Sequence, residues 1–210
     1  MIVKDLVGVS RKHIFLILFG LIASGCATTA GQMVGNATTT ALENLGFKKP
    51  EVPVEIPELQ KPPRKVKLRL FAGENLNADT KGRPLALVAR IYKLKSTSQF
   101  ADLPYDTFLN PAKEKEALGS DLIEVREVTL IPGKQYEFEE KIAREAGVLG
   151  IVTLFHSPSA ERWRYAFSAA DSEESGVTIG VHACAMTVSA GKLVVGNEAA
   201  AANLASSRCN

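Results

Sequence analysis

Cys184 and Cys209, together with His182, are the residues whose types and spacing first suggest chemistry. Residues two apart on a strand point to the same face, so His182 and Cys184 would lie side by side. Such a pair can act as base and nucleophile, or as two ligands of a metal ion. Packing within a sheet is the simpler interpretation. The chain has none of the spacings typical of zinc proteases, serine hydrolases or P-loops. We therefore expect no enzyme activity, no metal site and no cofactor.

Cys184 and Cys209 can also form a disulfide, provided that the protein resides in an oxidising compartment. In the chain-entropy description, closing a loop of about 25 residues stabilises the fold by roughly 3 kcal/mol. The alternative is a buried free thiol at Cys184 and a frayed tail that carries Cys209, in which the intervening segment AGKLVVGNEAAAANLASS is too mobile to hold a fixed geometry. The sequence leaves both possibilities open.

The third cysteine, Cys26, ends the segment LIASGC and follows a basic start and the apolar run Ile14–Ala23. That run is about 10 residues long, whereas a helix needs about 20 apolar residues to cross a bilayer. A basic start, a short apolar run and small residues at its exit are typical of a secretory signal peptide, here residues 1–25. The protein would then be exported, and its cysteines would meet an oxidising compartment.

Cys26 also resembles the acylated cysteine of the bacterial lipobox. The usual pattern has leucine three residues before the cysteine, whereas this chain has Ala23 there and Leu21 two places earlier. We expect a diacylglycerol and an N-acyl chain on Cys26, and Ala27 favours sorting to the outer membrane. The alternative is an ordinary secretory signal in which Cys26 is incidental.

The charge of the chain gives no indication of a nucleic-acid partner. The sequence has 25 basic and 23 acidic residues, and removal of residues 1–25 would take away three basic residues and one acidic residue. The remaining chain would carry no formal net charge, whereas nucleic-acid binding draws on a basic surface.

Composition divides the rest of the chain into a tether, a folded domain and a tail. Residues 26–64 contain Pro50, Pro53, Pro57, Pro62 and Pro63 and are expected to be an extended, lipidated tether. Residues 65–195 alternate between apolar and polar side chains in several short runs, which predicts an all-β, two-sheet antiparallel β-sandwich. The predicted strands begin with Lys65–Phe71 and Pro84–Leu94 and include Val148–Phe155 and Gly176–Val188. Residues 196–210 form an Ala-rich tail whose role is open.

Residues 96–119 do not alternate and are expected to form a helical insertion. Asn110 is a suitable N-cap, Pro111 suits the first helical position, and Gly119 suits the exit. The insertion would dock onto the sandwich through apolar side chains, namely Phe100, Leu103, Phe108 and Leu109.

Three further features bear on whether the domain binds a small ligand or a protein partner. The residues Trp163, Tyr165 and Phe167 alternate along one strand, so they form either a core face or a platform for a small ligand. The polar residues Asp171, Glu173 and Glu174 are expected in a solvated turn. Between the first two strands lies the long polar loop Ala72–Pro84, a place where sandwich domains often carry recognition.

The segment KLRLFAGENLNADTKGRPLALVARIYKLKS, Lys67 to Ser96, closely resembles the first hairpin of the type VI secretion lipoproteins of the TssJ/SciN/VasD family. The segments FADLPYDTFL, EVTLIPG, GVLGIVTLF and RWR follow in the order that the family shows. The similarity extends roughly from Lys65 to Lys192, and the lipobox fits it independently.

This resemblance implies a transthyretin-like β-sandwich that is anchored in the outer membrane and faces the periplasm. It implies a structural role, in which the first loop binds the periplasmic C-terminal domain of a TssM-like inner-membrane protein and helps assemble the type VI secretion membrane complex. We expect Leu76 to be the main apolar anchor of that contact. The alternative is a periplasmic lipoprotein that binds a small ligand at an exposed Trp163. The contact candidates carried over from the family are Gly73, Glu74, Asn75, Leu76, Asn77, Ala78, Asp79, Lys81 and Arg83.

Overall fold

The structure is a computed structural model that describes residues 55–205 and 207–209. The expected signal peptide, Cys26 and most of the expected tether lie outside the described residues. Residues from Glu55 onward form one compact unit with its own core. None of the helices in this described part is long and apolar enough to cross a membrane.

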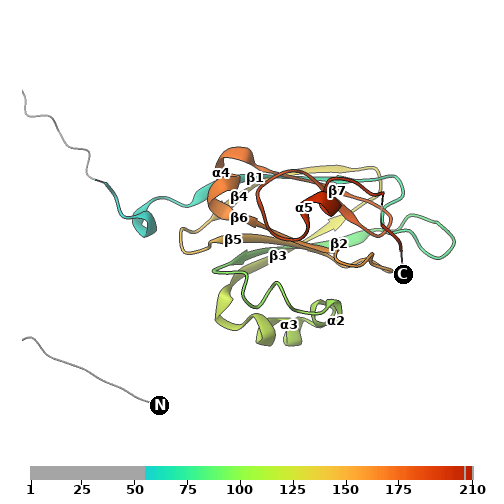
Figure 1. Ribbon diagram of the computed structural model, residues 1–210, viewed down its shortest axis with the longest axis horizontal. Coiled ribbons are helices and arrows are strands. Elements are labelled where there is room, and N and C mark those ends of the chain that lie inside the picture. Colours follow the sequence, from blue (N-terminus) through green and yellow to red (C-terminus); the bar gives the residue numbers. More distant parts are fainter. Residues whose placement is uncertain (1–54, 206, 210) are drawn as a thin grey trace, which may run out of the picture. The chain divides into compact units, whose positions relative to one another are not determined.

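Two β-sheets pack face to face around the core (Figure 1), so the predicted two-sheet β-sandwich is confirmed. One sheet has the strand order β4-β1-β7-β8, and the other has the order β3-β2-β5-β6-β9. The pairs are antiparallel except for β1 and β7, which are parallel, with Leu68 opposite Val177. The strands are β1 (Arg64–Ala72), β2 (Leu87–Leu94), β3 (Leu122–Leu130), β4 (Gln135–Ile142), β5 (Val148–Thr153), β6 (Arg164–Ser168), β7 (Val177–Val181), β8 (Met186–Ala190) and β9 (Leu193–Val195).

Strand β1 shows why the alternating pattern forms a half-buried strand. Val66, Leu68 and Leu70 are 0% exposed, whereas Lys65 and Lys67, which alternate with them, are exposed. Burial of each such aliphatic side chain contributes about 1.5–3 kcal/mol. The inner face of β1 therefore holds the four-stranded sheet against its partner sheet.

The helical insertion covers the outer face of the five-stranded sheet. It contains α2 (Tyr105–Phe108) and α3 (Pro111–Leu118), followed by a short 3-10 turn at Gly119–Asp121. Asn110 caps α3 as predicted, because its Oδ1 accepts hydrogen bonds from the N–H groups of Ala112 and Lys113. Gly119 ends α3 with a φ of 50°.

Aromatic side chains attach this insertion to the sheet. Phe100 and Phe108 are fully buried, and their ring centroids lie 5.4 Å and 6.0 Å from that of Tyr92 on β2. A Cβ added to Gly150 on β5 would lie 2.9 Å from the ring of Phe100, so this glycine makes room for the ring. The docking role expected for Leu109 is wrong, because this side chain is 54% exposed. It follows Phe108, and a helix this short turns only one face to the sheet.

Two predicted segments differ from the structure. The single strand expected at Gly176–Val188 is instead the hairpin of β7 and β8, because the His182 N–H donates to the Ala185 carbonyl and closes a turn at residues 182–185. The polar turn expected around Asp171 is instead helix α4 (Ala169–Ser175), which is capped by Ser168. Neither difference changes the sandwich, but the first moves Cys184 and His182 from a strand into a turn.

Candidate functional site

The loop between β1 and β2, residues 73–86, crosses from one sheet to the other at one end of the sandwich. It extends beyond the neighbouring turns at the right of the view in Figure 1. Every residue that the family resemblance assigns to partner contact lies in its first part, residues 73–83.

Backbone hydrogen bonds fix the beginning of this loop. The Gly73 N–H donates to the Val181 carbonyl at 2.8 Å, which continues the contact between β1 and β7. The Gly73 carbonyl accepts from the Leu76 N–H at 3.0 Å and from the Gly133 N–H at 3.3 Å. The loop therefore begins as a tight turn that is joined to both the β7 end and the β3–β4 turn.

Asn77 and Ala78, which follow Leu76 in the loop, pair with the turn between β7 and β8. The Asn77 N–H donates to the His182 carbonyl at 3.0 Å. The Ala78 N–H donates to the Ala183 carbonyl at the same distance. Two consecutive N–H groups are thus held by two consecutive carbonyls, which fixes the direction of the loop at this point.

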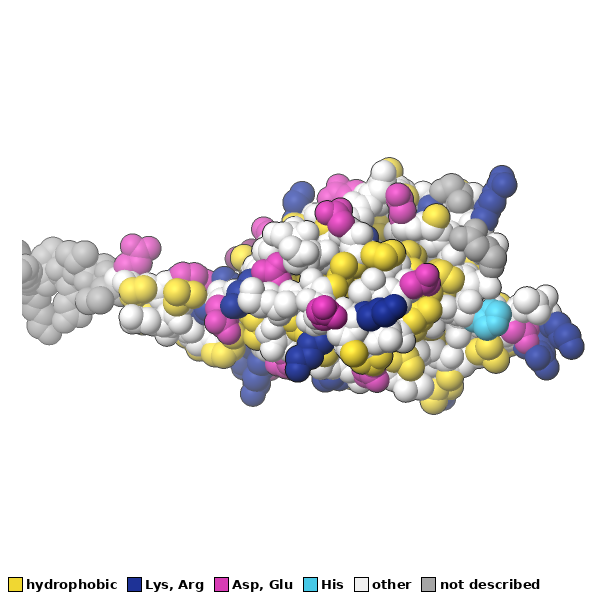
Figure 2. Space-filling model, turned by 90° about the horizontal axis from the view of Figure 1, so that it is seen from below, with side chains coloured by type: hydrophobic (Ala, Val, Ile, Leu, Met, Phe, Trp, Pro, Cys, Tyr) yellow, Lys and Arg dark blue, Asp and Glu magenta, His cyan; other side chains and the backbone are white. Residues whose placement is uncertain are grey.

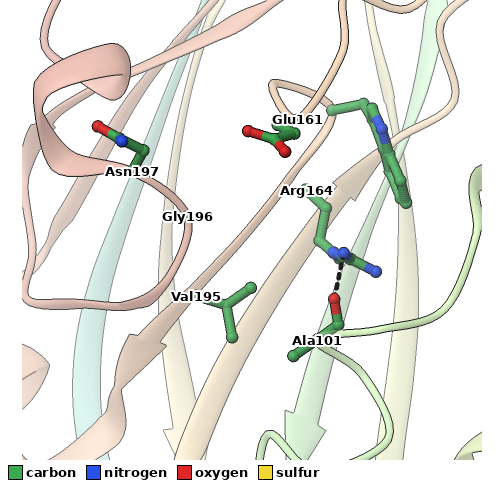
Figure 3. Close-up of a pocket in the computed structure, with 7 residues that line it drawn as sticks. Ala101, Glu161, Arg164, Val195, Gly196 and Asn197 are labelled. Atoms are coloured by element: carbon green, nitrogen blue, oxygen red, sulfur yellow. Dashed lines mark hydrogen bonds between the residues drawn. The ribbon is translucent and has the colours of Figure 1, made fainter.

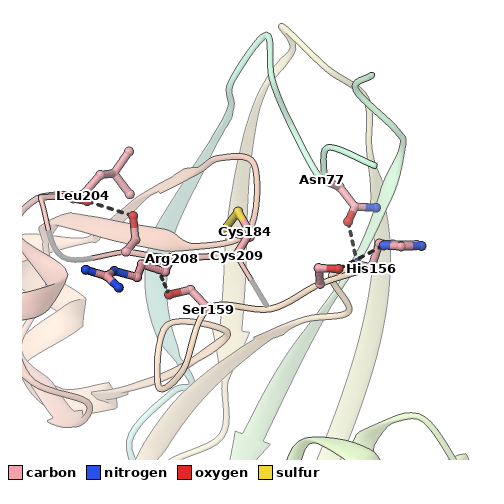
Figure 4. Close-up of a disulfide and its surroundings, with 9 residues drawn as sticks. Asn77, His156, Ser159, Cys184, Leu204, Arg208 and Cys209 are labelled. Carbon is pink, nitrogen blue, oxygen red and sulfur yellow. Dashed lines mark hydrogen bonds between the residues drawn. A yellow bond between two sulfur atoms is a disulfide. The ribbon is translucent and has the colours of Figure 1, made fainter. Parts of the chain in front are cut away.

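Asn77 is a structural residue of the loop. Its φ of 47° lies in the left-handed region, which asparagine adopts more readily than most residues. Only 6% of its surface is exposed. Its Nδ2 donates to the Ala86 carbonyl at 3.0 Å, and its Oδ1 accepts from the His156 N–H at 2.7 Å (Figure 4). The amide therefore joins the two sides of the loop to the β5–β6 connection, and it is not available to a partner.

Leu76 is also buried, so the expectation that it offers an apolar anchor to a partner is wrong for this structure. Its side chain is 0% exposed and belongs to the core. Its carbonyl accepts a hydrogen bond from the Leu85 N–H at 2.9 Å. The physical reason is that a leucine in a polar loop gains about 1.5–3 kcal/mol when it leaves water. Leu76 therefore anchors the loop to the hydrophobic core of the sandwich.

The tip of the loop is polar and organised around Asp79. Its Oδ1 accepts from the N–H groups of Lys81 and Arg83 at 2.8 Å and 2.9 Å, and its Oδ2 accepts from Arg83 Nε at 2.8 Å. These bonds, led by the Arg83 N–H, hold the pKa of Asp79 below its usual 3.8. Gly82 supplies a φ of 75° within the turn. The carboxylate shapes the tip. The Lys81 side chain is exposed, and the Arg83 side chain remains 70% exposed although it pairs with Asp79.

The contact candidates thus divide into exposed and buried residues. Glu74, Asn75, Lys81 and Arg83 are exposed, and the side chain of Arg83 is 70% exposed. Gly73, Ala78 and Asp79 are partly exposed. Figure 2 shows basic side chains with an acidic side chain beside them at the right-hand end of the molecule, where this loop lies. The surface that the loop presents is therefore polar and of mixed charge, with the basic Lys81 and Arg83 close to the acidic Asp79 and with Glu74 exposed at the start of the loop.

An apolar residue that sequence reasoning missed lies beside this loop. Ile131, in the turn between β3 and β4, is 51% exposed. The turn is joined to the loop through the hydrogen bond from Gly133 to Gly73. A Cβ on Gly133 would lie 2.8 Å from Glu74 Oε1, so the Glu74 side chain lies against the same turn. The signal in the sequence was an isoleucine directly before a Pro-Gly turn, where the strand pattern ends and burial is not expected.

The cysteine and histidine singled out in the sequence do not form a reactive pair. Cys184 is joined to Cys209 by a disulfide, with a Cα–Cα distance of 5.5 Å. His182 Nε2 lies 3.0 Å from Thr187 Oγ1, and burial lowers the pKa of His182 below its usual 6.5. In the described residues no group of three potential metal ligands is found. In this state Cys184 has no thiol that could act as a nucleophile or bind a metal.

The aromatic stripe is a core face. Tyr165 and Phe167 are 1% and 0% exposed, and Trp163 is 9% exposed. Trp163 packs edge-on against Tyr105 of α2, with ring centroids 4.9 Å apart. The exposed aromatic platform that a small-ligand-binding lipoprotein would need is therefore not formed by these side chains.

A cavity of about 410 Å³ lies beside this stripe (Figure 3). Two charged residues, Glu161 and Arg164, line it, and the Arg164 guanidinium donates to the backbone carbonyls of Phe100, Ala101 and Leu103. Arg164 thus holds the start of the helical insertion, because its Nη1 and Nη2 groups bind these backbone carbonyls. The lining residues are Ala101, Glu161, Trp163, Arg164, Val195, Gly196 and Asn197.

Comparison with known structures gives several similar chains. The type VI secretion lipoprotein TssJ1 from Pseudomonas aeruginosa is 28% identical, with a TM-score of 0.56, over 61% of this chain and 97% of that chain. A chain of a structure described as a type VI membrane complex is 25% identical, with a TM-score of 0.55, over 60% and 98% of the two chains. A chain of a structure of the TssM C-terminal domain from EAEC has the same fold, with 24% identity, a TM-score of 0.53, and coverage of 60% and 98%.

Comparison with curated protein sequences gives no significant match. The sequence profile of the family T6SS-SciN, described as type VI secretion lipoprotein, VasD, EvfM and TssJ, matches residues 64–184. This range contains the loop, both sheets up to the β7–β8 turn, and the helical insertion. The chain therefore belongs to the type VI secretion lipoprotein family.

Proposed function

We propose that this chain is a lipid-anchored adaptor of the outer membrane that binds the periplasmic domain of a TssM-like inner-membrane protein and helps assemble the type VI secretion membrane complex. Membership of the family supports the secretion role. The similarity to a chain of a type VI membrane complex supports a role in assembly. The partner is the one that the family resemblance implies, and a chain of the same fold occurs in a structure of the TssM C-terminal domain.

The observation that carries the proposal is the contrast within the loop between a fixed base and an exposed tip. Leu76 and Asn77 are buried and hold the base, while Lys81 and Arg83 are exposed at the tip, where Arg83 also pairs with Asp79. A loop that already has one conformation loses less entropy when it binds. Exposed basic side chains also favour encounter with an acidic surface. The contact surface in this proposal therefore consists of the tip, together with Glu74, Asn75 and the neighbouring Ile131.

Calorimetric binding to the periplasmic C-terminal domain of the TssM-like protein from the same organism tests this proposal. We would compare the domain 55–210 with the double variant Lys81→Ala/Arg83→Ala. Loss of both charges is expected to weaken binding about tenfold or more, which corresponds to about 1.4 kcal/mol. Near-ultraviolet circular dichroism should remain unchanged, because both side chains are exposed and the backbone N–H groups of residues 81 and 83 still bind Asp79 in the variant.

The matched control is Lys113→Ala/Lys115→Ala, which removes the same charge from exposed positions on α3. This control should bind as the wild type does. Equal weakening by both double variants would indicate general electrostatic attraction and would contradict a specific role of the loop. Absence of binding by the wild type would contradict the choice of partner.

The lipid anchor in this proposal is a diacylglycerol and an N-acyl chain on Cys26. Several acyl chains anchor a protein stably, whereas one chain binds a membrane only weakly. Mass spectrometry of the N-terminal peptide should find the acylated cysteine, and Cys26→Ser should release the protein from the outer-membrane fraction. Cleavage at another position, with an unmodified Cys26, would support an ordinary secretory signal and contradict the anchor.

A further inference from the structure

The C-terminal residues 196–209, which we call the strap, lie outside the range that the family profile matches. Part of the strap is helix α5 (Glu198–Ala201), which is capped by Asn197 and buries Ala201 against the core. The strap then returns to the end of the sandwich that carries the β1–β2 loop, where Cys209 is bonded to Cys184 (Figure 1). This addition to the family's domain therefore ends beside the proposed docking loop.

The strap is attached to the β7–β8 turn by a covalent bond. Cys209 forms the disulfide with Cys184, which lies in this turn (Figure 4). The two residues before Cys184 are His182 and Ala183, whose carbonyls hold the N–H groups of the loop. The residues that support the loop and the residue that is bonded to the strap are thus adjacent in one short turn.

The strap also contacts the second support of the loop, the β5–β6 connection. The Arg208 N–H donates to Ser159 Oγ at 3.3 Å, and the Ser159 N–H donates to the Cys184 carbonyl at 2.8 Å. Arg162 of the same connection donates to the carbonyl of Asn203 in the strap. This connection includes His156, whose N–H is held by Asn77 of the loop. Both supports of the loop are therefore joined to the strap.

We infer that the disulfide-closed strap is a brace that fixes the position of the β1–β2 loop, so that the proposed partner binds more weakly when the Cys184–Cys209 bond is absent. The consequence for binding rests on the proposed function, whereas the effect on the loop does not. Without the bond, the end of the strap keeps hydrogen bonds such as that of Arg208, but it has no covalent link to the β7–β8 turn. The turn then holds the loop less firmly.

Amide hydrogen exchange of the domain 55–210 tests the brace without any partner. This domain is suitable because residues from Glu55 onward form one compact unit. In the variant Cys209→Ser, the amides of Asn77 and Ala78 are expected to exchange about tenfold faster or more, since they open without global unfolding. Amides in the middle of β1, such as that of Leu68, should exchange as in the wild type. Unchanged exchange at Asn77 and Ala78 would overturn the inference.

Reduction gives a second route to the same state. An added dithiol donates two electrons and two protons to the Cys184–Cys209 bond, which becomes two thiols, while the dithiol becomes a cyclic disulfide. The reduced wild type should reproduce the exchange of Cys209→Ser. The dithiol should have no effect on Cys209→Ser itself, which controls for actions of the reagent elsewhere. An equal effect of the dithiol on both proteins would contradict the assignment to this bond.

Calorimetry with the TssM-like periplasmic domain then tests the consequence for binding. Cys209→Ser is expected to bind about threefold to tenfold more weakly than the wild type. If the variant shows faster loop exchange but equal affinity, the role of the brace in binding is wrong. If the loop exchange changes and the wild type itself does not bind, the proposed partner is wrong while the brace stands.

Discussion

The two ends of strand β1 lie at opposite ends of the sandwich and are held by different kinds of interaction. At its start, the carboxylate of Glu58 lies 2.8 Å from Arg64 and 3.0 Å from Arg144, and Arg144 also lies 3.1 Å from Glu173. At its end, the loop is held by backbone hydrogen bonds and by the buried amide of Asn77. The entry end thus combines charge pairs with hydrogen bonds from the Arg64 and Arg144 side chains to backbone carbonyls, whereas the loop end depends on hydrogen bonds without charge pairs at its base.

This difference has a functional meaning. Ion pairs that involve exposed carboxylates contribute little to the free energy of unfolding, about 0–1 kcal/mol each, and dissolved salt weakens them by screening. These ion pairs orient the chain where it enters the domain, but substitutions among them should change the stability little. Buried hydrogen bonds require one geometry, because an unpaired buried group costs about 1–3 kcal/mol. The end that we propose to bind a partner is therefore the end with the more strictly defined conformation.

The largest effect is expected from Leu76→Asp at the loop end. This change places a carboxylate in a fully buried apolar site, so it should lower the free energy of unfolding by about 4 kcal/mol or more. Urea denaturation followed by fluorescence measures the loss. Asn75→Asp is the control, since Asn75 is exposed and should change stability by less than about 0.5 kcal/mol. Equal stability of the two variants would show that Leu76 is not part of the core.

Asn77→Ala should have the next largest effect. It leaves the His156 N–H and the Ala86 carbonyl without their partner and forces alanine into a φ of 47°. At the lower end of their ranges, each of the two lost buried bonds costs about 1 kcal/mol and the backbone strain about 1 kcal/mol, so we expect a total loss of about 3 kcal/mol in urea denaturation. Asn77→Gly keeps the left-handed conformation accessible, so it should lose less stability than Asn77→Ala. A larger loss with glycine than with alanine would contradict the contribution of backbone strain.

At the entry end, Arg144→Ala should cost only about 1 kcal/mol. The change removes contacts to Glu58, Glu173 and the Pro62 carbonyl, but the carboxylates are partly exposed and return to water. Thermal unfolding should show that most of the wild-type advantage disappears in 1 M salt. A loss as large as that of Asn77→Ala, unaffected by salt, would remove the contrast between the two ends.

The smallest effect is a pH dependence of the loop end through His182. Burial lowers its pKa below 6.5 in the folded protein, so the unfolded chain binds more protons between 6.5 and the folded pKa. The contribution of His182 to the free energy of unfolding should therefore be constant above pH 6.5. It should fall slightly as the pH drops through this window. His182→Gln should remove that part of the dependence in thermal unfolding. A rise in stability on acidification from pH 6.5 would contradict the sign.

The strands and the insertion could be predicted because their signals are local. The alternation of Val66, Leu68 and Leu70 predicts β1, and Asn110 with Pro111 predicts the start of α3. The same reasoning could have found α4, since Ser168 is a suitable N-cap and Gly176 a suitable exit. The turn at residues 182–185 carries no glycine or proline, so the pattern continued through it as one strand.

The candidate loop could be located from the sequence, but the roles of its residues could not be assigned. Leu76 and Asn77 occur among polar residues, and nothing local distinguishes a side chain that turns inward from one that faces a partner. That distinction depends on the β5–β6 connection and the β7–β8 turn, which are far away in the sequence. The disulfide was one of two open possibilities for the same reason, since it requires the strap to return to Cys184.

The most direct test of the account is hydrogen exchange of the domain 55–210 with and without the TssM-like periplasmic domain. The amides of the loop tip that do not pair with carbonyls, such as that of Lys81, should become strongly protected in the complex, together with those around Ile131. Amides of α3 and α4 should be unaffected. Protection confined to α3 or α4, with no change between residues 73 and 83, would contradict the claim that this loop is the docking surface.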